Sequence, residues 1–147
     1  MILFIHGFAS CGLGEKSQSL RDFFGAEEVL LPNLPAEPAQ AIALLESLLH
    51  SQPIDLLIGS SLGGYYATWL NRQQARPSVL INPAVAPFEL FDSYRGVHNG
   101  CNNQPIRVDQ NYIDSLRQLH RPSLDANERY LVLLQTGDEV LDYRRAT

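Results

Sequence analysis

The sequence predicts an α/β fold built around a mainly parallel sheet. Five short apolar runs alternate along the chain with segments of helical periodicity, which is the pattern of a doubly wound sheet. The runs do not alternate polar and apolar residues, as expected for strands buried on both faces. The chain has 147 residues, 45% of them hydrophobic, which fits one globular domain spanning residues 1–147.

The elements follow in order. The predicted strands are Ile2–Ile5, Val29–Leu31, Asp55–Gly59, Val79–Asn82 and Tyr130–Gln135. Apolar residues at steps of three and four predict the helices between them, and these patterns lie at Leu20–Phe24, Ala41–Leu49, Leu62–Leu70 and Ile113–Leu119. Pro38 stands near the start of the second helix, and Asp109 is a suitable N-cap for the last.

A long connection, residues 84–127, separates the fourth and fifth strands. It contains the turn signal Asn99-Gly100 and one predicted helix. Long connections in compact domains are often lids or binding loops, so we predict a lid-like insertion. The alternative is a loose insertion with no binding role. Its apolar residues Phe88, Leu90, Phe91 and Tyr94 suit either a substrate pocket or core packing.

Composition argues against several functions. The net charge is −5 and the basic residues are spread along the chain, so we expect no nucleic-acid partner. No apolar run approaches the length of a membrane span, and the N-terminus lacks the features of a signal peptide. Cys11 and Cys101 form no CxxC pair, which favours reduced thiols in a cytoplasmic protein and leaves a single disulfide as the alternative. We expect no metal site and no cofactor.

The segment from Gly59 to Gly63 is the most informative one. It fits the G-x-S-x-G pattern with Ser61 at its centre, and it follows a predicted strand and precedes a predicted helix. A serine at such a sharp turn projects its hydroxyl above the sheet from a strained backbone, and the glycines avoid clashes around it. Ser60 does not fit, because Ile58 and Leu62 stand where glycines are needed. The alternative is a plain turn between two core elements.

The turn after the first strand carries His6, Gly7 and Phe8. An oxyanion hole in this position would use the backbone N–H groups of Phe8 and Leu62. Gly7 would let the loop approach the acyl group of a substrate. We expect His6 to organise this loop rather than to act as the catalytic base.

The loop after the fifth strand carries carboxylates. Asp138 is in register to orient and stabilise a catalytic histidine, and Asp142 is the reserve candidate. The alternative is a solvated acidic loop.

These segments together resemble the α/β-hydrolase fold. HGF at 6–8, GSSLGGYYATWL at 59–70, NPAVAPFEL at 82–90 and QTGDEVLDYR at 135–144 are similar to the YqiA-type esterases. The resemblance implies a three-layer α/β-hydrolase fold and a small, bacterial, cytoplasmic esterase of acyl esters or thioesters. It also implies that Ser61 is the nucleophile, that Asp138 is the acid, and that Asn82 shapes the substrate site.

The triad order of this fold places a histidine after the acid, but residues 139–147 contain none. The resemblance implies that the chain lacks the family's final strand and helix, and with them the histidine. We therefore expect an exposed edge strand at Tyr130–Gln135 and little activity from the chain alone. The predicted function is a serine esterase with a Ser-His-Asp triad. Alternatives are a non-catalytic hydrolase-fold binding protein, and a base from the insertion or from a partner chain.

Overall fold

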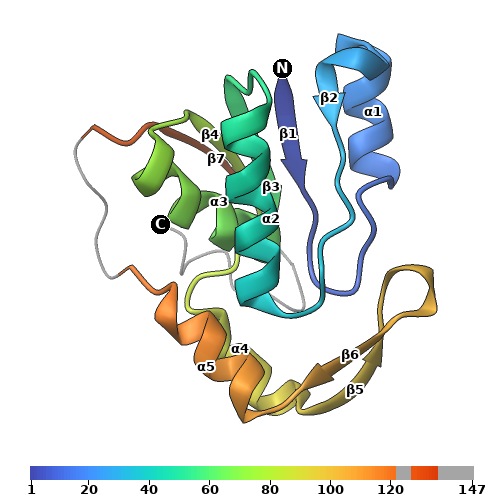
Figure 1. Ribbon diagram of the computed structural model, residues 1–147, viewed down its shortest axis with the longest axis vertical. Coiled ribbons are helices and arrows are strands. Elements are labelled where there is room, and N and C mark those ends of the chain that lie inside the picture. The colour runs from blue at the N-terminus through green and yellow to red at the C-terminus, as the bar shows by residue number, and fades with distance from the viewer. Residues whose placement is uncertain (122–126, 136–147) are drawn as a thin grey trace.

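A five-stranded parallel sheet forms the centre of the molecule. The computed structural model describes residues 1–121 and 127–135. The strands are β1 (Ile2–Ile5), β2 (Val29–Leu30), β3 (Leu56–Ser60), β4 (Ser78–Ile81) and β7 (Tyr130–Leu133). They lie in the order β2-β1-β3-β4-β7, and every neighbouring pair is parallel (Figure 1). The predicted parallel sheet is confirmed, and each predicted strand is present.

Helices cover both faces of this sheet, which confirms the three layers. Helices α2 (Pro38–Ser51) and α3 (Leu62–Gln74) lie on one face (Figure 1). There Leu3 and Leu57 belong to the main core. Helix α1 (Glu15–Phe24) lies on the other face, where its Leu20 packs against Phe4 and Ile58. Successive residues of each strand therefore enter different cores, which is why the strands show no polar alternation.

Helix α1 differs from the expectation in which residues it buries. The apolar side chains of Phe23 and Phe24 helped to predict this helix. In the structure they are 81% and 45% exposed, and their rings contact each other instead of the sheet. The short 3₁₀ turn η1 (Ala26–Glu28) then leads into β2.

The insertion between β4 and β7 is a packed substructure rather than a loose loop. It contains α4 (Pro87–Phe91), the turn η2 (Asp92–Tyr94), β5 (Gly96–Asn99), the turn η3 (Cys101–Asn103), β6 (Pro105–Val108) and α5 (Gln110–Gln118). Strands β5 and β6 form an antiparallel hairpin. The Asp109 carboxylate caps α5 by accepting from the Tyr112 N–H at 3.0 Å, as predicted. The Tyr65 hydroxyl of α3 donates to the Leu116 carbonyl at 2.6 Å and so fixes α5 to the main body.

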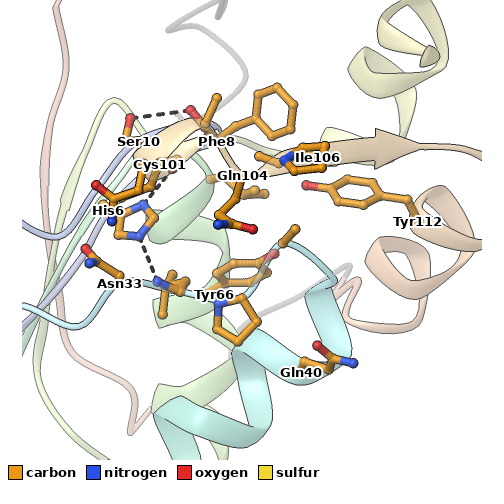
Figure 2. Close-up of a pocket in the computed structure, with 18 residues that line it drawn as sticks. His6, Phe8, Ser10, Asn33, Gln40, Tyr66, Cys101, Gln104, Ile106 and Tyr112 are labelled. Carbon is orange, nitrogen blue, oxygen red and sulfur yellow. Dashed lines mark hydrogen bonds between the residues drawn. The ribbon is translucent and has the colours of Figure 1, made fainter. Parts of the chain in front are cut away.

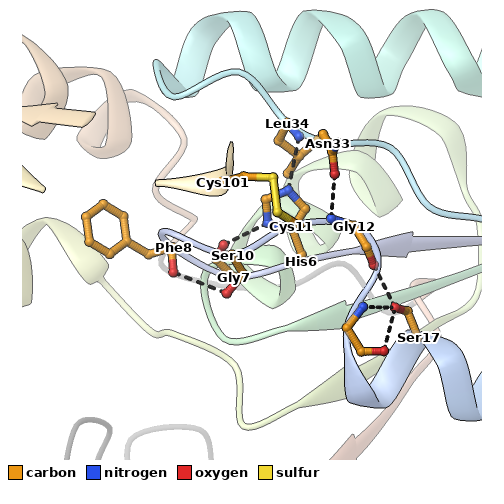
Figure 3. Close-up of a disulfide and its surroundings, with 11 residues drawn as sticks. His6, Gly7, Phe8, Ser10, Cys11, Gly12, Ser17, Asn33, Leu34 and Cys101 are labelled. Carbon is orange, nitrogen blue, oxygen red and sulfur yellow. Dashed lines mark hydrogen bonds between the residues drawn. A yellow bond between two sulfur atoms is a disulfide. The ribbon is translucent and has the colours of Figure 1, made fainter. Parts of the chain in front are cut away.

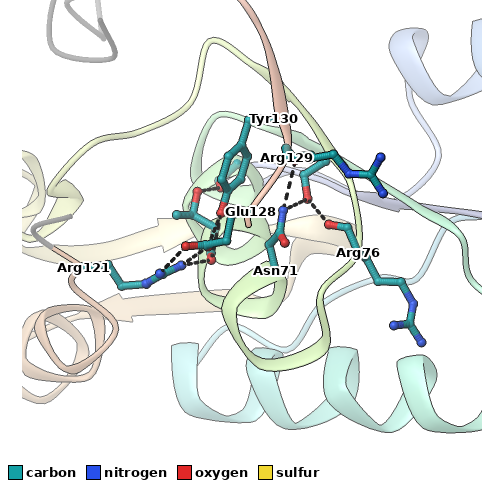
Figure 4. A network of polar contacts seen from close by, with 9 residues as sticks. Asn71, Arg76, Arg121, Glu128, Arg129 and Tyr130 are labelled. Carbon is teal, nitrogen blue, oxygen red and sulfur yellow. Dashed lines mark hydrogen bonds and ion pairs between the residues drawn. The ribbon is translucent and has the colours of Figure 1, made fainter. Parts of the chain in front are cut away.

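A second set of polar contacts fixes the chain where it enters β7 (Figure 4). Arg121 and Glu128 form an ion pair whose side chains are only 3% and 4% exposed. The Tyr130 hydroxyl donates to the same carboxylate at 2.8 Å. The Asn71 amide of α3 donates to the Arg129 carbonyl at 3.2 Å. These bonds hold the start of β7 against α3.

Within the described residues, strand β7 lies at one edge of the sheet. Its residues Leu131, Val132 and Leu133 are 57%, 37% and 48% exposed. This agrees with the predicted exposed edge. Across residues 1–121 and 127–135, no helix combines the length and the apolar character needed to cross a bilayer.

Cys11 and Cys101 are joined in a disulfide (Figure 3). The expectation of reduced thiols is therefore wrong, and the alternative of a single disulfide holds. The bond connects the loop after β1 with the tip of the β5–β6 hairpin. It is a covalent tie between the insertion and the loop that carries Phe8.

Candidate active site

Ser61 stands between β3 and α3 in an unusual backbone conformation. Its φ is 58° and its ψ is −117°, a region that favours glycine and costs a serine on the order of 1–3 kcal/mol. Hydrogen bonds hold it there. The Ser61 N–H donates to the Ile81 carbonyl at 3.0 Å, and the Ser61 carbonyl accepts from the N–H groups of Gly64 at 3.0 Å and Ala84 at 2.9 Å. The surroundings therefore impose the strain on Ser61, as a nucleophile elbow requires.

The glycines around Ser61 are needed because backbone lies against them. A Cβ atom on Gly63 would lie 2.0 Å from the Ile5 carbonyl oxygen, and one on Gly59 would lie 2.4 Å from the Gly63 carbonyl oxygen. The clash predicted from the sequence pattern is confirmed. A Cβ on Gly64 would lie 2.8 Å from Pro83 Cβ, a constraint that the pattern did not reveal.

The loop after β1 lies directly beside the elbow. A Cβ on Gly7 would lie 3.2 Å from Ser61 Cβ and 3.3 Å from the Ser60 carbonyl oxygen. Phe8 and Leu62 line the same cavity as Ser61. Leu62 is the first residue of α3, so its N–H has no partner within the helix. Among the described residues, neither the Phe8 N–H nor the Leu62 N–H donates to a protein group. Their role as an oxyanion hole stays a prediction.

A cavity of about 420 Å³ opens above Ser61, and we call it the nucleophile cavity. The insertion supplies its apolar wall through Leu90, Phe91 and Tyr94, three of the four residues proposed for this role. The fourth, Phe88, does not line the cavity and packs against His120 instead. Lys16 from α1 is the charged side chain among the described residues that line it.

The ring of Phe8 is held by aromatic side chains of the insertion. Its centroid lies 4.8 Å from that of Phe91, 5.4 Å from His98 and 6.3 Å from Tyr112, all edge-on. Such contacts contribute about 0.5–1.5 kcal/mol each beyond the area that they bury. The insertion thus supports the residue whose N–H is proposed to bind the oxyanion.

His6 organises the loop after β1, as expected. It is 7% exposed, and both ring nitrogens contact backbone. Nε2 accepts from the Leu34 N–H at 3.0 Å, so Nδ1 carries the proton and donates to the Gly7 carbonyl at 2.8 Å. Burial lowers the pKa of His6 below its ordinary value of 6.5. The neutral ring has no nitrogen left for catalysis.

This burial predicts a pH dependence of stability. Below about pH 6.5 His6 is protonated in the unfolded chain, whereas burial disfavours its protonation in the folded protein. The free energy of unfolding therefore falls as the pH drops. Urea unfolding at about pH 7.5 and about pH 5.5 should show a smaller loss in His6→Gln than in the wild type. His120→Gln, which changes an exposed side chain, is the matched control. Equal losses in all three proteins would contradict the prediction.

His98 is the histidine that lines the nucleophile cavity within the described part of the chain. Its Nε2 contacts the Tyr94 carbonyl, and no hydrogen bond joins it to Ser61. His50 contacts Gln74 on the surface. The predicted acid Asp138 and its reserve Asp142 lie outside the described residues. The sequence left open that a histidine of the insertion reaches Ser61, and the fold of the insertion places His98 at this cavity without a hydrogen bond to Ser61.

Asn82 lies at the end of β4 with a φ of 43°. Its N–H donates to the Leu133 carbonyl at 2.9 Å, and its Oδ1 accepts from the Gln135 N–H at 2.6 Å. It lines neither cavity described for this site. Contact of Asn82 with a substrate therefore stays a prediction. What the side chain does in the structure is fix the chain immediately after β7.

Hydrogen bonds and a disulfide hold the rim of the site, residues 10–14, in place. The Gly12 N–H donates to Asn33 Oδ1 at 2.8 Å, and the Ser17 hydroxyl donates to the Gly12 carbonyl at 2.6 Å (Figure 3). A Cβ on Gly12 would lie 2.3 Å from the Leu31 carbonyl oxygen. Together with the disulfide at Cys11, these contacts explain why the rim is fixed.

Reduction of the disulfide should destabilise the protein. The two cysteines are 90 residues apart, so opening the bond restores a large loop to the unfolded chain and costs about 3 kcal/mol. Urea unfolding with and without dithiothreitol measures the change. The double variant Cys11→Ser/Cys101→Ser should match the reduced wild type and should not respond to the reductant. A stability that is independent of reductant in the wild type would refute this prediction.

A family model matches the whole chain, residues 1–147, and its description is an uncharacterised protein family, UPF0227. The chain belongs to the UPF0227 family. This UPF0227 chain is also similar to solved structures. One is a monoacylglycerol lipase from Paleococcus ferrophilus, with 13% identity and a TM-score of 0.71, covering 99% of this chain and 76% of that one.

The second solved structure is a putative hydrolase from Agrobacterium vitis S4, at 16% identity and a TM-score of 0.72. The match covers 99% of the UPF0227 chain and 71% of the hydrolase. At these identities the similarity concerns the fold. The predicted α/β-hydrolase fold is confirmed.

Proposed function

We propose that this protein is a serine hydrolase that cleaves carboxylic esters or thioesters of acyl groups. The observation that carries the proposal is the strained Ser61, held by hydrogen bonds beside two backbone N–H groups that donate to no group within residues 1–121 and 127–135. A turn between two core elements has no need of a serine in this conformation. A nucleophilic serine needs this conformation, because it projects the hydroxyl above the sheet.

The proposed reaction has two halves. Ser61 Oγ attacks the acyl carbonyl carbon while a histidine takes its proton, and the N–H groups of Phe8 and Leu62 hold the developing oxyanion. The tetrahedral intermediate collapses, the C–O or C–S bond breaks, and the imidazolium returns its proton to the leaving alcohol or thiol. Water, deprotonated by the same histidine, then releases the acid and restores Ser61.

The base in this proposal is a histidine that follows Asp138, C-terminal to residue 147, and that Asp138 orients. His6 is occupied by backbone contacts, and His98 has no hydrogen bond to Ser61. We also propose a small-molecule substrate whose acyl chain contacts Leu90 and Phe91. The similarity of the fold to that of a monoacylglycerol lipase supports an ester substrate.

The second candidate is a binding protein with a hydrolase fold. It is favoured by one observation: within the described ranges, no histidine is hydrogen-bonded to Ser61. Covalent labelling of the serine separates the two candidates, because only an activated serine reacts rapidly with a fluorophosphonate.

The test is intact-mass spectrometry of the protein isolated from its own cells, before and after treatment with a fluorophosphonate probe. The wild type and Ser60→Ala should gain one adduct, and Ser61→Ala should gain none. His98→Gln should still label, because the proposed base lies elsewhere. A wild type without adduct would favour the binding protein, and loss of the adduct in His98→Gln would transfer the role of base to the insertion.

A further inference from the structure

A second cavity, of about 380 Å³, lies on the other side of Phe8, and we call it the neutral cavity. It shares part of its wall with the nucleophile cavity, namely Gly7, Phe8, Ser10 and Leu62. The remaining wall comes from the segment 33–36 before α2, from α2 and α3, and from the β5–β6 hairpin and α5 (Figure 2). The two proposed oxyanion donors thus lie between the two cavities. A substrate whose carbonyl is bound by these donors can extend one arm into each.

The neutral cavity has no ionised side chain in its wall among the described residues. Its lining contains no aspartate, glutamate, lysine or arginine, in contrast to Lys16 in the nucleophile cavity. His6 lines it, but both ring nitrogens are bound to backbone, and burial lowers the pKa of this ring. An anion entering this space would lose water without gaining a cationic partner in the wall, which is costly. The carboxylate of Glu37, which acts on Tyr66 of the wall, would repel it as well.

The cavity nevertheless offers hydrogen bonds. Tyr66 and Tyr112 line the cavity and are 2% and 4% exposed, and no hydrogen bond joins either hydroxyl to another described residue. Figure 2 shows Tyr112 pointing from α5 toward the centre of the cavity, with Gln104 and Ile106 of the hairpin nearby. Burial raises the pKa of both tyrosines, so both hydroxyls stay protonated donors. The Gln104 and Gln40 amides add donors and acceptors to the wall.

We propose that the neutral cavity binds an uncharged, hydrogen-bonding arm of the substrate, such as a hydroxyl-bearing alcohol. This inference rests on the esterase function proposed above and names the class of substrate. The acyl chain occupies the nucleophile cavity against Leu90 and Phe91. The hydroxyls of Tyr66 and Tyr112 and the Gln104 amide select the other arm by hydrogen bonding. Buried donors left unpaired by an apolar arm make that arm bind more weakly.

The position of Gln104 is fixed by the fold of the hairpin. Its N–H donates to the Cys101 carbonyl at 3.1 Å, and its carbonyl accepts from the Gly100 N–H at 2.8 Å. Cys101 itself lines the cavity and is tied to Cys11. Gln104 is exposed, so replacing its side chain leaves the core intact. It is therefore a suitable residue for a test by mutation.

The experiment measures binding rather than turnover. The probes are three hexanamides, whose amide carbonyl replaces the ester carbonyl: N-(2-hydroxyethyl)hexanamide, N-propylhexanamide and N-hexanoylglycine. Dissociation constants come from titrations that follow the ring signals of carbon-13-labelled tyrosine. The hydroxyethyl probe should bind about three- to tenfold more tightly than the propyl probe, and the anionic glycine probe should bind most weakly.

Variants locate the effect. Gln104→Leu and Tyr112→Phe should each weaken the hydroxyethyl probe about threefold and leave the propyl probe unchanged. Gln18→Leu, on the exposed face of α1 and outside both cavities, should change nothing. Equal binding of hydroxyethyl and propyl probes, or tighter binding of the glycine probe, would overturn the proposal. So would a hydroxyethyl preference that both cavity variants retain.

The same titration in Ser61→Ala separates this inference from the proposed function. A hydroxyethyl preference that persists without Ser61 supports the neutral cavity independently of catalysis. If this preference is found but the wild type does not react with a fluorophosphonate, the result supports the proposed role of the neutral cavity and contradicts the esterase function. If Ser61 reacts but the three probes bind equally, the result supports the esterase function and contradicts the proposed role of the neutral cavity.

Discussion

Alanine at position 63 is expected to destabilise the protein by about 4 kcal/mol or more, the largest stability effect of any substitution considered for this chain. The added Cβ would lie 2.0 Å from the Ile5 carbonyl oxygen, 2.6 Å from the Ile5 carbonyl carbon and 2.7 Å from the His6 carbonyl oxygen. All three are backbone atoms at the end of β1. No side-chain rotation relieves the contact, so α3 and β1 must move apart.

Urea unfolding of Gly63→Ala measures this loss, and Gly14→Ala is the matched control. A Cβ on Gly14 meets no atom within 4 Å, and its φ of −161° suits any residue. We expect the control to cost about 1 kcal/mol or less, since Gly14 is the N-cap of α1 and alanine is a poorer N-cap than glycine. Equal stability changes in the two variants would show that β1 and α3 are not packed as closely as described.

Glycine in place of Ser61 is expected to have two opposite effects. Reaction with a fluorophosphonate is lost altogether, because the nucleophilic hydroxyl is gone. The free energy of unfolding rises by about 1 kcal/mol, because a φ of 58° with a ψ of −117° strains serine but not glycine. The gain is smaller than the strain, since glycine also increases the entropy of the unfolded chain.

Thermal unfolding and intact mass test both effects in one sample of Ser61→Gly. The melting temperature should rise by about 2–4 °C. Ser60→Gly is the control, because Ser60 lies in the regular strand β3, where glycine costs about 0.5–1 kcal/mol and the nucleophile is untouched. A Ser61→Gly protein that is less stable than the wild type would mean that Ser61 is not strained.

The parallel sheet could be predicted because its signal is local. Each strand is a short apolar run, and the helices between them show clear periodicity. The hairpin β5–β6 could not be predicted beyond its Asn99-Gly100 turn. Its first strand, Gly96–Asn99, is mostly exposed and carries only one apolar side chain, Val97. Its pairing depends on the disulfide and on the packing of the insertion, which connect residues far apart in the sequence.

The site divides in the same way. Ser61, Gly59 and Gly63 form a local pattern, so their roles followed from spacing. The need for glycine at Gly64 depends on Pro83, and the place of His98 beside Phe8 depends on the folded insertion. Nothing in the sequence shows that two cysteines 90 residues apart pair with each other, so the disulfide could be given only as an alternative. Tertiary contacts determine all three, and spacing does not report them.

The residues that hold Ser61 and the residues that line the substrate cavities come largely from different parts of the chain, and this affects how the protein can diversify. The elbow is constrained by contacts within the sheet and α3, where substitution is hardly tolerated. Much of the wall that faces a substrate comes instead from one contiguous stretch of chain, residues 84–112, which includes Phe91, His98, Gln104 and Tyr112. Exchange of that stretch between related proteins would transplant substrate preference as a single heritable module, while the reaction centre is inherited unchanged.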